Sequence, residues 1–126
     1  MGTFSLAKSE RLLRRADFKK LSEGGNSIET DYFVILYGHN GLGTFRLGVT
    51  VGKRVGCAVM RNRVKRLVRE HFRLRKALFR GSYDVNVIAK GGTSDLSPRE
   101  IRGALEDIVR DMLRDCKHEA VSAGTH

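Results

Sequence analysis

The chain has 126 residues, of which 40% are hydrophobic and 30% are charged. This length suits one compact domain, and the apolar content is too high for a wholly disordered protein. The 24 Lys and Arg residues outnumber the 14 Asp and Glu residues, for a formal net charge of +10. We therefore expect a polyanionic partner, with nucleic acid as the first candidate.

The N-terminal part predicts one short helix. It contains no uninterrupted apolar stretch of signal-peptide length, so we expect a cytoplasmic protein. The helix is expected from Leu13 to Ser22 and ends before Gly24 and Gly25. Its apolar residues are Leu13, Phe18 and Leu21.

Two strands are expected next. Tyr32 to Tyr37 is rich in aromatic and β-branched residues, and it is the longest apolar run, far short of the roughly 18 residues that span a membrane. His39 to Thr44 has the composition of a turn, and Phe45 to Val51 alternates between apolar and polar residues. This pattern predicts a hairpin and no membrane segment.

A helix from Ala58 to Phe79 and a strand from Tyr83 to Ala89 follow, which predicts a strand, helix, strand unit. In the last helix Ser97 can act as the N-cap, with Glu100 completing a capping box. The core side of this helix is Ile101, Leu105, Ile108 and Met112. From Asp95 to Glu119 there are seven acids and five bases, so the positive charge lies elsewhere.

The positive charge is concentrated between Lys53 and Arg80, where eleven Lys or Arg residues accompany one acid, Glu70. On a helical wheel the apolar side is Val64, Leu67, Val68, His71, Leu74 and Leu78. The opposite side is Arg61, Asn62, Lys65, Arg66, Arg69, Arg73 and Lys76. A solvated helix face usually mixes both signs, because like charges four residues apart repel. A polyanion would relieve that repulsion.

Two aromatic side chains and two cysteines receive ordinary interpretations. His71 lies within the apolar side, so we predict a core histidine and not a catalytic base. Phe72 lies at the edge of that side, where packing at the core edge is favoured over stacking on an unpaired base. Cys57 and Cys116 lack Cys-x-x-Cys spacing, so we expect reduced thiols and no metal site.

Several motifs resemble the signature of the bacterial ribonuclease P protein family. They are Lys53-Arg54, Ala58-Val59, Arg61-Asn62-Arg63, Lys65-Arg66 and Arg69-Glu70. The resemblance extends from about Arg11 to Cys116 through Ala16-Asp17-Phe18, Arg46-Leu47-Gly48-Val49-Thr50-Val51 and Tyr83-Asp84-Val85. It implies an α+β two-layer sandwich with a roughly four-stranded mixed sheet, a short N-terminal helix, a left-handed crossover through the basic helix, and a C-terminal helix. Residues 11–117 would form one domain, with flexible extensions at 1–10 and 118–126.

The resemblance also implies a function. The family's protein is a non-catalytic subunit that assists a catalytic RNA, which removes the 5′ leader from precursor tRNA with magnesium ions. We therefore expect one protein per catalytic RNA, and neither catalytic nor metal-binding residues in the protein. The RNA-binding residues would be Lys53, Arg54, Arg61, Asn62, Arg63, Lys65, Arg66, Arg69 and Arg73. The leader cleft would contain Phe18, Val34 and Leu36, bordered by Arg61, Asn62, Lys65 and Arg69 of the basic helix.

The sequence departs from relatives at three positions. Leu36 stands where some relatives have Tyr, and Ser22 where some have a second Phe, which predicts weaker stacking in the cleft. Cys57 stands where Asn is frequent, which predicts the loss of a side-chain cap on the basic helix, at a cost of about 1 kcal/mol.

Charge alone would also allow a ribosomal-type RNA-binding protein or an RNA chaperone, and the Arg61-Asn62-Arg63 motif argues against both. A protein nuclease would need a general acid and base that converge on one phosphate. The four histidines suggest no such pair. A helix-turn-helix DNA-binding protein would need a partner helix just before the basic one.

Overall fold

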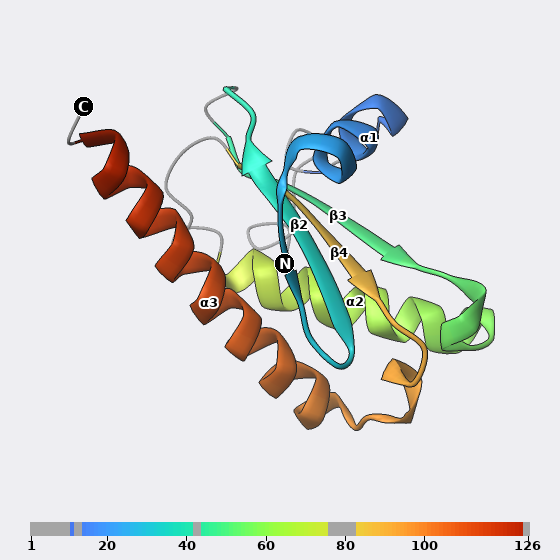
Figure 1. Ribbon diagram of the computed structural model, residues 1–126. Coiled ribbons are helices and arrows are strands. Elements are labelled where there is room, and N and C mark those ends of the chain that lie inside the picture. The colour runs from blue at the N-terminus through green and yellow to red at the C-terminus, as the bar shows by residue number, and fades with distance from the viewer. Residues whose placement is uncertain (1–10, 12–13, 42–43, 76–82, 125–126) are drawn as a thin grey trace.

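The fold is a four-stranded mixed sheet with helices on both faces, seen in a computed structural model that describes residues 11, 14–41, 44–75 and 83–124, with side chains through 114 (Figure 1). The helices are α1 (Arg15–Gly24), α2 (Ala58–Arg75) and α3 (Pro98–Gly124). The strands are β1 (Asn26–Glu29), β2 (Phe33–His39), β3 (Arg46–Val51) and β4 (Tyr83–Ala89), with short 3₁₀ turns η3 (Lys53–Val55) and η5 (Thr93–Asp95). The expected α+β class is confirmed. The expected domain end at 117 stays a prediction, although α3 continues past it.

The order of the strands is β1-β2-β4-β3, so the predicted hairpin is wrong. β2 and β3 both pair with β4, antiparallel and parallel respectively, and do not pair with each other. The hairpin in the structure joins β2 to β1, a strand that the sequence did not reveal. Only Ile28 of β1 is half-buried, so the strand lacks the alternation that would mark it.

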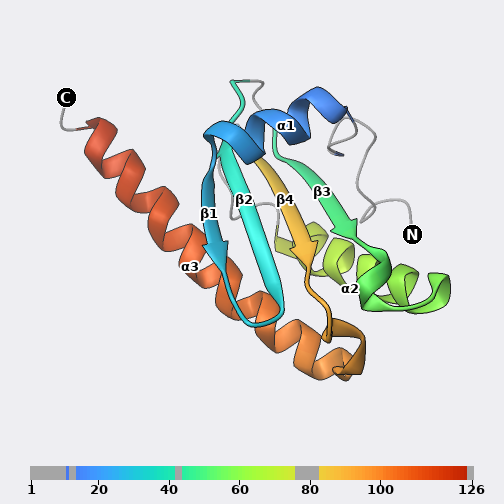
Figure 2. The same cartoon turned by 45° about the vertical axis from the view of Figure 1, so that its right-hand side comes forward.

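α2 connects the parallel neighbours β3 and β4. In Figure 2 both strands run downward, β4 lies to the left of β3, and α2 lies behind the sheet. A crossover of this geometry is left-handed, opposite to the usual rule for such units. The handedness implied by the family resemblance is therefore confirmed.

The core lies between the sheet and the two helices α2 and α3. Alternate residues of the strands point into it, such as Phe33, Ile35 and Tyr37 of β2. The expected core residues of α3, Ile101, Leu105, Ile108 and Met112, are all buried. Of the apolar side predicted for α2, Val64, Leu67, Val68 and His71 are buried. Burial of this apolar surface is the main force that holds the layers together.

Two residues of α2 depart from the wheel. Leu74 is 57% exposed, because it lies at the outer edge of the groove between α2 and α3, so its assignment to the core was wrong. Phe72 is 0% exposed and its ring stacks at 6.4 Å on Phe45. Packing of Phe72 in the core is thus confirmed, and stacking on RNA is excluded. Leu78 and Lys76 lie outside the described residues.

The predicted start of α3 is confirmed. The Glu100 amide donates to the Ser97 hydroxyl at 3.2 Å, and the Ser97 amide donates to the Glu100 carboxylate at 3.0 Å. This reciprocal pair is a capping box. The hydrogen bonds from Ser97 hold the pKa of Glu100 below its usual value.

Candidate nucleic-acid interface

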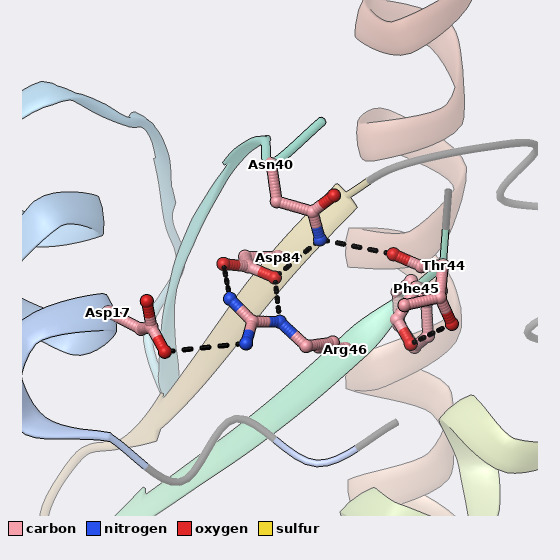
Figure 3. A network of polar contacts seen from close by, with 6 residues as sticks. All are labelled: Asp17, Asn40, Thr44, Phe45, Arg46 and Asp84. Carbon is pink, nitrogen blue, oxygen red and sulfur yellow. Dashed lines mark hydrogen bonds and ion pairs between the residues drawn. The ribbon is translucent and has the colours of Figure 1, made fainter. Parts of the chain in front are cut away.

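α1 is fixed on the sheet by one arginine. The Arg46 guanidinium on β3 makes two hydrogen bonds to Asp84 on β4, at 2.7 and 2.6 Å, and a third to Asp17 on α1, at 3.3 Å (Figure 3). Asn40 donates to the same Asp84 carboxylate at 2.7 Å. The hydrogen bond from Arg46 to Asp84, the largest effect, raises the pKa of the guanidinium. These contacts hold α1 across the sheet near the N-terminal ends of β3 and β4.

A hollow of about 650 Å³ lies beside α1 on the open face of the sheet. We call it the Phe18 hollow. Its lining residues come from α1 (Arg15, Phe18, Lys19, Ser22) and from three strands (Leu36, Thr50, Asn86, Ile88). Its floor is continuous, since Leu36 is the direct neighbour of Asn86, and Thr50 of Ile88, in adjacent strands. The hollow therefore combines a half-buried aromatic ring with two exposed cationic side chains.

The structure brings together two of the three residues that the sequence assigned to the leader cleft, namely Phe18 and Leu36. Val34 lies on the same face of β2, opposite Ile88, but does not line the hollow. Sequence reasoning missed Arg15, Lys19 and Asn86. A signal for the first two was present, because positions 15, 18, 19 and 22 form one stripe of a helix at spacings of three and four.

The basic side of α2 faces solvent as predicted. Asn62, Arg63, Arg66 and Arg69 are exposed, and so are Lys53 and Arg54 in η3, whereas Arg61, Lys65 and Arg73 are half-buried. Among the residues that the structure describes, the Arg61 Nε is buried without a hydrogen-bond partner. An N–H group in that state favours an acceptor such as a phosphate oxygen.

A second, smaller hollow of about 420 Å³ lies on α2 itself. Its lining is Val59, Asn62, Arg63 and Arg66, and Val59 is 78% exposed. No residue of α2 is among the described residues that line the Phe18 hollow. The predicted grouping of Asn62 with Phe18 in one cleft is therefore not seen as a single pocket, and the basic helix carries a surface of its own.

Both surfaces are connected through β3. Thr50 at the edge of the Phe18 hollow is followed within the chain by the exposed Lys53 and Arg54 of η3, and then by the start of α2. A polyanion that leaves the hollow over β3 thus meets positive charge next.

The start of α2 differs from the prediction for Cys57. The Cys57 carbonyl accepts the first helical hydrogen bond, from Arg61 at 2.9 Å, so Cys57 is the N-cap residue. Its exposed free thiol also contacts the Met60 amide, and that hydrogen bond lowers the pKa of the thiol. The cap expected to be lost is therefore provided by sulfur, a weaker acceptor than oxygen.

His71 is a core residue, as expected. Its side chain is 3% exposed, and Nε2 lies 3.3 Å from the Glu106 carboxylate of α3 without the geometry of a hydrogen bond. Burial, aided by the charge of Arg75, lowers the pKa of His71 to about 4. The imidazole is therefore neutral near pH 7.

Within the described part of the chain, no helix is both long and apolar enough to cross a membrane. Over the same residues, no three His, Cys, Asp or Glu side chains lie close enough together to hold a metal ion.

Together, the fold and this surface define a small α+β protein with a left-handed crossover through a strongly basic helix. Residues 6–113 match the family described as Ribonuclease P. The ribonuclease P protein component of Desulforapulum autotrophicum is 45% identical over 90% of this chain and 97% of its own length. That of Desulfatibacillum aliphaticivorans is 37% identical over 94% and 100%. The chain belongs to the ribonuclease P protein component family.

Solved structures of RNase P proteins have the same fold as this chain. The RNase P protein of Staphylococcus aureus superposes with a TM-score of 0.79 at 33% identity, over 83% of this chain and 96% of that one. The RNase P protein of Thermotoga maritima superposes with a TM-score of 0.70 at 35% identity, over 79% and 94%.

Proposed function

We propose that the chain is the RNA-binding protein subunit of a ribonuclease P ribonucleoprotein in the cytoplasm, whose catalytic RNA removes the 5′ leader from precursor tRNA. The observation that carries this proposal is the charge of α2, which has seven Lys and Arg residues and one acid, Glu70, in a chain of this family. Such a charge repels itself in isolation and is stabilised by phosphates.

The two surfaces suit two kinds of RNA contact. The Phe18 hollow offers an aromatic ring and a floor of mixed apolar and polar side chains beside two cations, which suits unpaired nucleotides of the leader. The face of α2 offers Arg side chains and the unpartnered Arg61 Nε, which suits phosphates of the catalytic RNA and of the leader as it passes. The protein thereby raises the affinity of the holoenzyme for its substrate.

The protein contributes no catalytic group in this proposal. Cleavage and its magnesium ions belong to the RNA, and one protein serves one catalytic RNA. His71 would be unsuited to general acid or base work, because its side chain is buried and a pKa of about 4 lies far below neutral pH.

Reconstitution tests the proposal. The purified chain is mixed with a bacterial ribonuclease P RNA, and cleavage of precursor tRNA is followed against magnesium concentration. We expect no cleavage by protein alone, cleavage at lower magnesium with protein present, and tighter binding of long-leader than of leaderless substrate. Cleavage by RNA-free protein would refute the proposal. Faster annealing of unrelated RNAs, without any effect of leader length, would instead favour an RNA chaperone.

A further inference from the structure

The floor of the Phe18 hollow contains one buried polar side chain, Asn86 of β4. It is 5% exposed, yet it lines the hollow together with Leu36 and Ile88. A buried amide without enough hydrogen bonds costs free energy, so its partners need to be identified.

Among the described residues, only the oxygen of the Asn86 amide has a hydrogen-bond partner. The Thr50 hydroxyl on β3 donates to the Asn86 Oδ1 at 3.2 Å. Among the residues that the structure describes, the Asn86 side chain has no other hydrogen-bond partner. Within that part of the chain the Nδ2 group, which carries two N–H donors, has no acceptor, so it can donate to a molecule that enters the hollow.

The surroundings of Asn86 suit a nucleobase. Leu36 lies directly across the strand pair, Ile88 lies on the same face of β4, and Phe18 provides an aromatic ring from α1. A base that stacks on a ring presents its edge to the groups around it, and that edge carries the hydrogen-bonding pattern that identifies the base.

We propose that Asn86 is a specificity-determining residue that reads one base of the bound RNA leader and favours guanine over adenine. This inference rests on the proposed function, because it requires the leader to occupy the Phe18 hollow. Asparagine usually recognises adenine with both halves of its amide, since adenine presents a donor beside an acceptor. The Thr50 hydroxyl occupies one of the two acceptor sites of the Asn86 oxygen, whereas both Nδ2 donors lack a partner among the described residues. Asn86 therefore offers more donors than acceptors and matches the two adjacent acceptors of guanine, O6 and N7.

The test uses the reconstituted holoenzyme and precursor tRNAs whose leader carries each of the four bases at each position in turn. Relative kcat/KM values in competition give the preference at each position. For the unmodified chain we expect guanine to exceed adenine at one leader position by about fivefold, the effect of one hydrogen bond. For Asn86→Leu we expect that ratio to fall to about one, through loss of rate with guanine.

Two further variants distinguish a loss of base recognition from a loss of protein stability. Thr50→Val keeps the amide but releases its oxygen, so guanine should lose its advantage over adenine while the leader still binds. Glu23→Gln changes an exposed side chain of α1 that does not line the hollow and should leave the ratio unchanged. A variant that merely unfolds would lower kcat/KM equally for all substrates. Urea unfolding of each variant checks its stability.

The outcomes are distinguishable. A preference for adenine, no preference at any position, or a guanine-to-adenine ratio in Asn86→Leu as high as in the unmodified chain would overturn the role of Asn86 while leaving the leader-binding proposal intact. If leader length itself had no effect on the unmodified holoenzyme, the proposed function of the hollow would fail first.

Discussion

Arg46 and Asp84, which are direct neighbours across β3 and β4, form a bidentate ion pair beneath α1. Two parallel hydrogen bonds fix the guanidinium plane more strictly than a single contact would. Because the third hydrogen bond of Arg46 goes to Asp17, the pair also positions the next residue, Phe18. The wall of the hollow thus depends on a contact that lies outside it.

Removal of the Asp84 carboxylate should destabilise the protein. In Asp84→Ala the Arg46 side chain, 16% exposed, would keep only the longer contact to Asp17. Loss of one partner from a buried pair costs about 3 to 5 kcal/mol, and we expect about 3 because Asp17 remains. Urea unfolding followed by circular dichroism measures the change in free energy.

An exposed ion pair on α1 gives the matched control. Lys19 and Glu23 are 3.9 Å apart with side chains 72% and 66% exposed. Water screens such a pair, so Glu23→Gln should change the free energy of unfolding by less than about 0.5 kcal/mol. Equal effects of the two substitutions would contradict the role assigned to the buried pair.

The junction between α1 and β1 is the next point to test. A Cβ atom on Gly25 would lie 2.7 Å from the Leu21 carbonyl oxygen and 3.0 Å from that of Tyr37. Both are backbone atoms, so Gly25→Ala should displace α1 and cost about 1 to 3 kcal/mol. Gly24→Ala, with nothing within 4 Å of its Cβ, should be neutral or slightly stabilising. Similar thermal stabilities of the two variants would contradict this.

His71 should make stability depend on pH. An unfolded chain binds a proton at this imidazole near pH 6.5, whereas the folded protein does so only near 4. Between these values the unfolded state holds more protons, so stability is complete above about pH 6.5 and falls as pH decreases. The loss due to His71 should reach about 2 kcal/mol at pH 5.

The charged groups around His71 define the control. Arg75 lies on the same helix, while Glu106 and Arg102 face it from α3. Urea unfolding at pH 7.5 and pH 5 is compared for the unmodified chain and for His71→Leu, which cannot titrate. The difference between the two pH dependences isolates the imidazole. Identical pH dependences would show that His71 is protonated equally in both states.

Much of the fold followed from periodicity in the sequence. The core residues of α3 recur every three or four positions, and the Ser97 and Glu100 box marks its start, so local patterns were sufficient. Local sequence patterns did not predict the order of the strands in the sheet. β4 inserts between β2 and β3, and nothing in the turn after His39 distinguishes a hairpin from a loop that skips a strand.

The sequence predicted those site residues whose positions follow from local helix geometry, and missed one whose role depends on neighbouring strands. Arg61 and Lys65 could be placed on one side of α2 because helix geometry fixes the angle between them. Asn86 could not be identified, because its significance depends on Thr50 and Leu36 in neighbouring strands. Cys57 showed a further limit, since its thiol contacts the Met60 amide at the start of α2, where the replacement of the family's frequent Asn predicted the loss of a side-chain cap.

The salt dependence of RNA binding should separate the basic face of α2 from other positive charge. Each phosphate contact contributes nearly one unit to the slope of log affinity against log salt. Arg61→Ala and Lys65→Ala should each make that slope about one unit shallower and weaken binding of different RNA sequences to a similar extent. Arg110→Ala is the matched control, because Arg110 lies on α3, 66% exposed and beside Asp107, and its loss should leave the slope unchanged. Binding of precursor tRNA to the holoenzyme at several salt concentrations gives the three slopes. If the Arg110 variant lost as much slope as the Arg61 variant, net charge and not the face of α2 would govern the affinity.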